Sequence, residues 1–181
     1  MNVYFTIGHS TRSLAEFRAC LDAQRVGLVA DVRSIARSRT NPQFNRDTLP
    51  GALARDGIDY MHVAALGGRR GRAADVDPAV NAWWQVAAFH NYADHALSPA
   101  FAAGMDALRA LGATRRVAVM CAEAVWWRCH RRIVADYLLA GGAEVVHIMG
   151  VDKVEPALLT PAAQLRADGS IVYPAGDLVD G

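Results

Sequence analysis

Reactive side chains of several kinds occur together in residues 117–132. An apolar run ends at Cys121, Glu123 follows, and a basic cluster from Arg128 to Arg132 precedes an apolar pattern at helical spacing. A thiol and a carboxylate at the end of a strand can act as nucleophile and proton carrier. A helix start with arginines favours anions and thiolates. The segment therefore predicts a site for an anionic ligand, without naming the substrate.

Three interpretations of Cys121 are compatible with the sequence. As a nucleophile, the thiol would be activated by the helix start and by Arg128. As a small buried hydrophobic residue, it would be inert. As a metal ligand it would need donor partners, and the candidates are Cys129, His130, Glu123 and His9. The Cys-to-Cys spacing matches no standard zinc pattern, so we assign no metal ligand.

Arginines at the start of the expected helix 128–140 are the strongest candidates for anion binding. Arg128 and Arg132 share a helix face, and Arg131 lies three residues after Arg128. Cations there oppose the helix dipole, which a bound anion or a nearby carboxylate would relieve. We therefore place Arg128, His130 and Arg131 among the substrate-binding residues.

A second candidate element is the turn Gly8-His-Ser-Thr-Arg12 between a strand and a helix. Backbone N–H groups in such a turn can hold an anion, with hydroxyl groups assisting. The alternative is a capped turn without a ligand. The substrate-binding candidates from this turn are His9, Ser10, Thr11 and Arg12.

Asp31-Val-Arg33 places a carboxylate beside a guanidinium at the end of another expected strand. Asp31 would act as a general base or bind a metal while Arg33 clamps an anion, or the two would form a structural ion pair. Residues 33–72 hold eight arginines against three aspartates. Arg37 belongs to this basic stretch and is a further binding candidate, although arginine-rich composition alone can produce such clusters.

The elements that must position these residues alternate between strands and helices. Strands are expected at 3–7, 28–31, 58–63, 116–120 and 145–148, and helices at 13–24, 47–55, 80–88, 91–97, 98–111 and 128–140. This order predicts one α/β domain over residues 1–181, with a mostly parallel sheet and helices on both faces. Residues 150–181 are expected to form a packed extension.

Parallel strands would bring their carboxyl ends to one edge of the sheet. His9, Asp31, Arg33, Cys121 and Glu123 would then surround one cleft. Residues 67–78 combine glycines, arginines and aspartates without an apolar period, which predicts a mobile lid over that cleft.

Composition excludes several classes of protein. The chain has 181 residues, of which 52% are hydrophobic and 20% charged, as in ordinary globular domains. We see no span long enough for a bilayer and no signal peptide, so we expect a cytoplasmic location. Three cysteines do not suggest a disulfide framework. Trp83-Trp84 and Trp126-Trp127 would form either a base-stacking surface or ordinary packing.

Several motifs together resemble the bacterial domain-of-unknown-function family numbered 488 (DUF488). They are Thr6-Ile-Gly-His-Ser-Thr-Arg12, Asp31-Val-Arg-Ser34, Arg37-Ser-Arg39, Asn41-Pro-Gln-Phe-Asn45, Leu66-Gly-Gly68, Cys121-Ala-Glu123 and Arg128-Cys-His-Arg131. The resemblance runs from about residue 3 to the end of the chain and implies little chemistry. Trp126-Trp127 departs from it, because members often carry a proline there.

The order strand, Cys121, loop, helix, Gly-Gly and strand is also similar to rhodanese-type sulfurtransferases, so the fold would be Rossmann-like or rhodanese-like. Phosphatases with a Cys-x5-Arg loop are more distant, because six residues separate Cys121 from Arg128.

The leading hypothesis is an enzyme acting on an anionic ligand such as a nucleotide or a nucleic-acid component. Cys121, Glu123 or Asp31 would do the chemistry. One alternative is a non-catalytic module that binds a nucleotide or nucleic acid, and another is a rhodanese-like sulfurtransferase using Cys121. The sequence assigns no cofactor, reaction type or oligomeric state.

Overall fold

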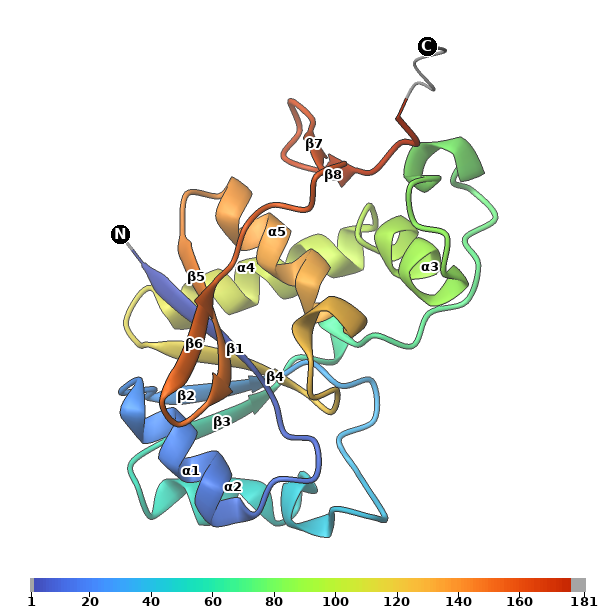
Figure 1. Ribbon diagram of the computed structural model, residues 1–181. Helices are drawn as coiled ribbons and strands as arrows, with labels where there is room; N and C mark the ends of the chain where they lie inside the picture. Colours follow the sequence, from blue (N-terminus) through green and yellow to red (C-terminus); the bar gives the residue numbers. More distant parts are fainter. Residues whose placement is uncertain (1, 177–181) are drawn as a thin grey trace.

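A computed structural model describes residues 2–176 of the chain. Its centre is a six-stranded sheet in the order β3-β2-β4-β1-β5-β6, in which β1 to β5 are parallel and β6 is antiparallel to β5 (Figure 1). The strands are β1 (Val3–Gly8), β2 (Leu28–Asp31), β3 (Asp59–His62), β4 (Val117–Cys121), β5 (Glu144–Gly150) and β6 (Lys153–Pro156). The α/β class expected from the sequence is thus confirmed.

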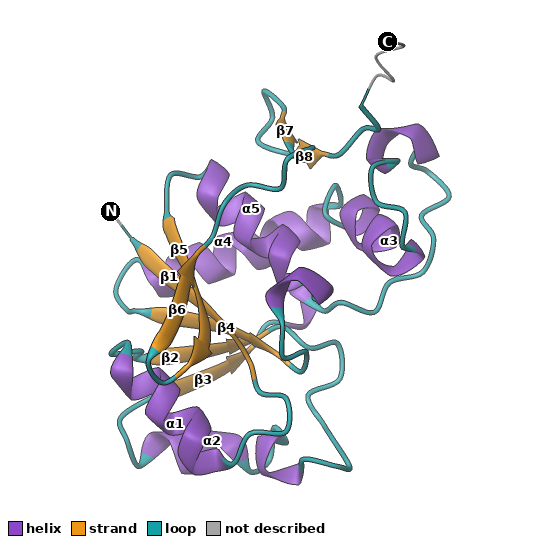
Figure 2. Cartoon of the chain, in the orientation of Figure 1, coloured by secondary structure: helices purple, strands orange, loops and turns teal. Residues whose placement is uncertain are grey.

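The central strands are almost entirely apolar because helices cover both faces of the sheet (Figure 2). Successive side chains of a strand point to opposite faces, so Tyr4 and Phe5 of β1 belong to two separate apolar clusters. Gly112 makes room for the first of them, since a Cβ there would come within 2.1 Å of the Tyr4 hydroxyl oxygen.

Helices α1 (Leu14–Ala23) and α2 (Leu49–Ala54) cover one face, together with the 3-10 turn η1 (Pro42–Phe44). Ser13 caps α1 by accepting a hydrogen bond from the backbone N–H of Glu16. Phe17 and Leu21 on the inner side of α1 are fully buried. These side chains form one apolar cluster with residues of β1, β2, β4 and β5.

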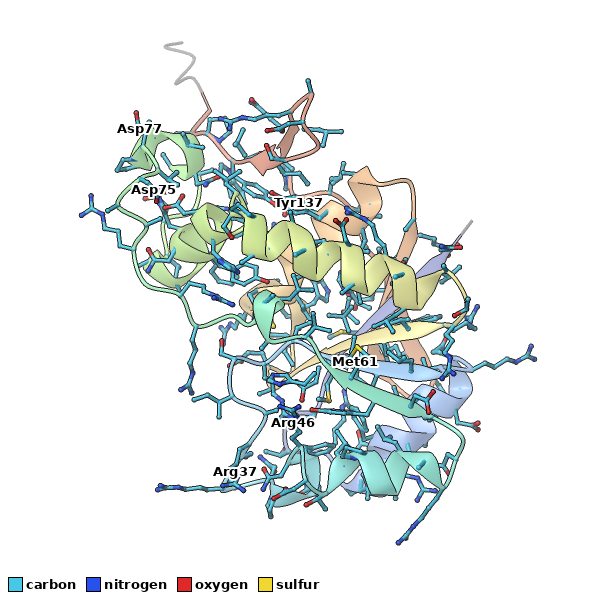
Figure 3. The ribbon with its side chains drawn as sticks, turned by 180° about the vertical axis from the view of Figure 1, so that it is seen from behind. Arg37, Arg46, Met61, Asp75, Asp77 and Tyr137 are labelled. Atoms are coloured by element: carbon cyan, nitrogen blue, oxygen red, sulfur yellow. The ribbon has the colours of Figure 1, made fainter. Side chains whose placement is uncertain are left out.

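Helices α3 (Ala87–His95), α4 (Pro99–Gly112) and α5 (Arg131–Ala140) lie on the other face (Figure 1). Ser98 caps α4, with proline at its first helical position. Tyr137 of α5 packs on Phe101 of α4, and its hydroxyl group donates to the backbone oxygen of Ala96 and accepts from the backbone N–H of Ile171 (Figure 3). Tyr137 thereby joins α4, α5 and the C-terminal segment.

The C-terminal segment contains β6 and a short hairpin of β7 (Gln164–Leu165) and β8 (Ile171–Val172). Tyr173 is fully buried and donates to Asp136 Oδ2 at 2.8 Å. Tyr173 thus links the C-terminal segment to Asp136 of α5. The last residues of the expected extension, 177–181, lie outside the described residues.

Three details differ from expectation. The helix expected at 128–140 begins at Arg131, because residues 126–128 form the separate 3-10 turn η4 (Trp126–Arg128). The helices expected at 80–88 and 91–97 are replaced by the 3-10 turn η3 (Pro78–Asn81) and by α3. Strand β6 was not expected at all, since its half-exposed edge position leaves no apolar pattern.

Another 3-10 turn, η2 (Ala64–Leu66), follows β3 and leads into residues 67–78. Arg70 anchors the first part of that segment through hydrogen bonds to the backbone oxygens of Gly67 and Ala64. Asp75 and Asp77 lie on its exposed later part (Figure 3). The lid expected from the sequence is therefore fastened at its beginning, and its mobility stays a prediction.

Within residues 2–176, no helix has the length and apolar character needed to cross a membrane.

Candidate functional site

A cleft of about 640 Å³ lies at the carboxyl ends of β1, β2 and β4. It is bordered by the turn after β1, the loop after β2, the start of residues 67–78, and the loop between β4 and α5. Of the residues predicted from the sequence, those that line it are His9, Ser10, Thr11, Arg33, Arg37, Cys121, Glu123, Arg128 and His130. The expected convergence at one sheet edge therefore brings most of the candidates together.

Close contact between the ends of β1 and β4 forms one wall. The backbone N–H of His9 donates to the oxygen of Cys121 at 2.9 Å, and that of Ser10 donates to Ala122 at 3.0 Å. A Cβ on Gly8 would come within 1.7 Å of the Glu123 oxygen, so only glycine fits there. These N–H groups bond the neighbouring loop, so they are not free to hold an anion as the turn motif predicted.

The Asp31–Arg33 pair lies buried beneath the cleft. Arg33 donates from Nε to Asp31 Oδ1 at 2.9 Å and from Nη2 to Asp31 Oδ2 at 2.6 Å. Tyr60 adds a hydrogen bond to Asp31 Oδ2 at 2.5 Å. Asp31 is fully buried and does not line the cleft, so its contacts favour the structural ion pair over the general base.

His9 connects this ion pair to the cleft. Its Nε2 lies 3.2 Å from Arg33 Nη1, and its Nδ1 lies 2.9 Å from the Ser10 oxygen. Because Nε2 must accept from the guanidinium, Nδ1 carries the proton and the ring is neutral. Burial lowers the pKa of His9, and Arg33 lowers it further. Phe44 stacks on the ring at 4.4 Å and fixes its plane.

Arg131 is almost fully buried behind the loop between β4 and α5, at 1% exposure. Its Nη1 donates to Cys121 Sγ at 2.6 Å and to the Glu123 oxygen at 2.7 Å, and its Nη2 donates to the Ala124 oxygen at 3.3 Å. Nε has no hydrogen-bond partner among the described residues. The guanidinium thus faces a thiol and two carbonyl groups.

The thiols of Cys121 and Cys129 form a coupled pair on this guanidinium. Burial raises the pKa of Cys121 well above its ordinary value, and the hydrogen bond to Cys129 adds to that. Burial acts the same way on Cys129, but the hydrogen bond from Cys121 and the charge of Arg131 lower its pKa to about 7. Cys129 also accepts from the backbone N–H of Arg131 at 3.5 Å, at the start of α5. The lowered pKa, together with the N–H at the start of α5, therefore favours Cys129 over Cys121 as the thiolate.

His130 lies beside the Cys129 thiol. Its Nε2 lies 2.9 Å from the Val32 oxygen and must donate to it, which leaves Nδ1 as an acceptor 3.6 Å from Cys129 Sγ. Burial lowers the pKa of His130 and keeps the ring neutral. Gly68 packs on this ring, since a Cβ there would come within 2.3 Å of Nδ1.

The rim of the cleft is basic and exposed. Arg37, Arg69 and Arg128 line it, and Arg37 forms a pair with Asp47 at 3.2 Å in which both side chains are largely exposed. Such a pair binds weakly, so Arg37 is available to a ligand. Glu123 also lines the cleft and is exposed.

Two predicted binding residues do not line the cleft. Arg12 donates to the backbone oxygens of Gly8 and Met149 and pairs with Glu16, so it joins β1 to β5. Arg131 contacts Cys121 Sγ through its guanidinium and Cys129 Sγ through its backbone N–H. Residues that sequence reasoning missed are Ser34, Gly68, Arg69, Phe89 and Cys129. Among them, Ser34, Gly68 and Cys129 had a signal, because they belong to the motifs Asp31-Val-Arg-Ser34, Leu66-Gly-Gly68 and Arg128-Cys-His-Arg131.

The loop after Cys121 presents carbonyl groups to the site. The oxygens of Glu123 and Ala124 accept from Arg131, and the Glu123 oxygen lies 3.9 Å from Cys121 Sγ. A sulfurtransferase or phosphatase loop needs N–H groups directed at the sulfur and its anionic cargo. The rhodanese-like interpretation therefore lacks support. Within the described part of the chain, no group of three or more His, Cys, Asp or Glu residues is arranged to hold a metal ion.

The tryptophans serve packing. Trp84 is buried and stacks on Phe89, and Trp126 stacks on His147 at 4.5 Å. Arg132 lies over the rings of Trp83, Trp84 and Trp126. Trp127 is 45% exposed, but it lies edge-on to Trp126. The base-stacking interpretation is therefore less favoured than packing.

Fold and site define an α/β protein with a pair of buried thiols at the carboxyl edge of its sheet. A family model described as "Domain of unknown function DUF488" matches residues 13–138, and the chain belongs to this family. No curated protein matches the chain. No solved structure matches it either.

Proposed function

We propose that the chain is an enzyme that uses a thiolate of the Cys121–Cys129 pair to attack a small anionic molecule bound in the cleft. The contact between Arg131 and these thiols carries the proposal. A buried guanidinium needs a compensating negative charge, because burying an unpaired charge is very costly. Among the described residues, no carboxylate forms a salt bridge with Arg131, whereas Cys121 Sγ lies 2.6 Å from its Nη1. The charge of Arg131 lowers the pKa of Cys129, so a Cys129 thiolate beside the Cys121 thiol would supply that charge.

The neighbours of the pair suit covalent catalysis. His130 Nδ1 faces Cys129 and is positioned to accept its proton, with Val32 fixing the ring. Glu123 on the rim would transfer a proton to or from the bound molecule. Asp31 is a positioning residue, which holds Arg33 and through it His9.

Size and charge of the cleft indicate the ligand class. Its volume of about 640 Å³ lies in the range of pockets for nucleotide-sized molecules. Arg37, Arg69 and Arg128 suit phosphate or carboxylate groups, and the hydroxyl groups of Ser10 and Thr11 add hydrogen bonds. A nucleotide, a nucleic-acid component or another small anion fits this description.

Competing alkylation with an anionic and a neutral reagent tests the proposal. Iodoacetate and iodoacetamide both transfer a carbon to a thiolate and release iodide, but only iodoacetate is charged. We expect the ratio of their rates on Cys129 to exceed that of a free thiol by about ten-fold, because a basic cleft concentrates anions. Peptide mass spectrometry identifies the labelled residue, and inorganic phosphate or a nucleotide should slow the reaction.

Arg69→Gln and Arg128→Gln should return this ratio toward that of the free thiol, whereas Arg116→Gln, far from the cleft over the Phe5 ring, should not. A rate ratio equal to that of the free thiol would contradict an anion-binding cleft. Slow labelling of both cysteines at pH 9, together with tight nucleotide binding, would instead favour the non-catalytic module.

A further inference from the structure

Attack by a nucleophile needs one thiol, whereas this cleft holds two. Cys121 and Cys129 line the same cleft and both contact Arg131, one through the guanidinium and the other through the backbone N–H. Cys20 lies on α1, in the apolar cluster on the opposite face of the sheet. Cys121 and Cys129 are thus placed as a pair, and Cys20 lies apart from them.

The two thiols differ in their contacts, and this difference assigns them different roles. Cys129 accepts a hydrogen bond from the backbone N–H at the start of α5, and its pKa is lowered to about 7, so it is the thiol that ionises first. Cys121 is the thiol closest to the guanidinium. Once Cys129 forms a bond to another sulfur it can no longer carry charge, and Arg131 then stabilises the thiolate of Cys121.

We propose that the pair is a dithiol that reduces small anionic disulfides, with Cys129 as the attacking thiol and Cys121 as the resolving thiol. This inference rests on the proposed thiolate. Cys129 attacks one sulfur of the disulfide, its S–S bond breaks, and the first thiolate leaves and takes up a proton. Cys121 gives up its proton and attacks Cys129 Sγ, which releases the second thiolate and closes the Cys121–Cys129 disulfide. The substrate gains two electrons, and an excess of a small thiol returns the pair to the dithiol.

Depth and charge select the substrate. Both thiols are 2% exposed at the bottom of the cleft, so the disulfide of a folded protein cannot reach them. A molecule that fits 640 Å³ can, and the arginines on the rim favour carboxylate groups over ammonium groups. Disulfides of small acidic peptides meet both requirements.

Arg131 also biases the equilibrium. In the disulfide form the guanidinium would stay buried without a negative partner, whereas the dithiol form supplies a thiolate. The dithiol is therefore the favoured state, and the disulfide should be reduced readily by small thiols.

The test mixes the reduced protein with oxidised glutathione, which is anionic, or with cystamine, which is cationic. Acid-quenched samples are read by intact mass and peptide mapping. We expect wild type to lose the mass of two hydrogen atoms through a Cys121–Cys129 bond. For each disulfide, the wild-type rate is divided by the rate of a free thiol. This ratio should be about ten-fold higher for oxidised glutathione than for cystamine. Cys121→Ser should stop at a glutathione adduct on Cys129, and Cys129→Ser should form no adduct at Cys121 at neutral pH.

Cys20→Ser is the matched control and should react as wild type does, and circular dichroism checks that each variant folds. Wild type that stops at the mixed disulfide would overturn the inference, even where iodoacetate labelling upholds the thiolate. Equal relative rates with oxidised glutathione and cystamine would overturn it without relying on any variant. Thiols that react with neither iodoacetate nor disulfides would remove the proposed function as well.

Discussion

Gly68 lies against the ring of His130 so closely that a Cβ at residue 68 would come within 2.3 Å of Nδ1. This contact joins the segment after β3 to the residue beside the Cys129 thiol. Gly67 is needed for a separate reason, since a Cβ there would come within 2.7 Å of the Ser34 backbone.

Substitution Gly68→Ala should therefore displace His130 and lower the free energy of unfolding by about 1–3 kcal/mol, as overpacking does in other cores. Alkylation of Cys129 should change with it, because His130 Nδ1 is the neighbour that moves. Gly71→Ala is the control, because nothing lies within 4 Å of its added Cβ. Urea unfolding measures stability, and equal stability of the two variants would contradict the close contact.

Replacing Arg131 should raise the pKa of the reactive thiol. Arg131→Met removes the charge that lowers the pKa of Cys129. We expect that pKa to move from about 7 to its ordinary value or higher, because burial is then uncompensated. Thiolate absorbance in the ultraviolet, followed across pH, measures the shift. Arg132→Met is the matched control, since Arg132 contacts Trp83, Trp84 and Thr160 instead of the thiols. A similar titration curve for both variants would count against the thiolate.

Stability should rise with pH between about 7 and 9. The pKa of Cys129 is lowered from 9.0 to about 7 in the folded chain, so in this window the unfolded thiol holds a proton that the folded one has lost. The gain is at most about 3 kcal/mol at 1.4 kcal/mol per pKa unit, and it disappears as pH falls through 7. Urea unfolding at pH 6.5 and 8.5 measures it. The rise should be absent from Cys129→Ser, and an unchanged rise in that variant would assign it to other groups.

The buried ion pair should be intolerant of losing one partner. Asp31→Asn leaves the Arg33 guanidinium buried without a counter-charge, which should cost about 3–5 kcal/mol. Tyr60→Phe removes one of the hydrogen bonds to Asp31 and should cost about 1–2 kcal/mol. Thermal or urea unfolding ranks the two variants. The reverse order would mean that Asp31 is not held chiefly by Arg33.

The sequence predicted the framework of the site well, because that framework depends on local patterns. Apolar runs ending at Asp31 and Cys121 predicted parallel strands, and parallel strands bring His9, Arg33 and Cys121 to one edge. Capping residues such as Ser13 and Ser98 gave helix starts that agree with the structure to within a residue.

The pairing of side chains could not be predicted in the same way. The sequence placed Cys129 within one helix that begins at Arg128, but residues 126–128 form η4 and α5 begins only at Arg131. Cys129 lies between these two elements and lines the same cleft as Cys121. Arg131 was expected to reach a ligand, whereas its side chain is buried against the loop carbonyls. Both depend on the backbone path of residues 122–130, which has no periodic pattern from which to read it.

The buried Arg131 also constrains the order in which substitutions can accumulate. A change of Cys129 to an apolar residue leaves the Arg131 charge buried without a negative partner. A change of Arg131 to an apolar residue leaves the backbone oxygens of Glu123 and Ala124 without their hydrogen-bond donor. Losing Cys121, Cys129 and the Arg131 guanidinium together, with apolar replacements of similar volume, can be far less costly than losing any one of them. A chain that loses these three residues by single substitutions must therefore pass through a less stable intermediate.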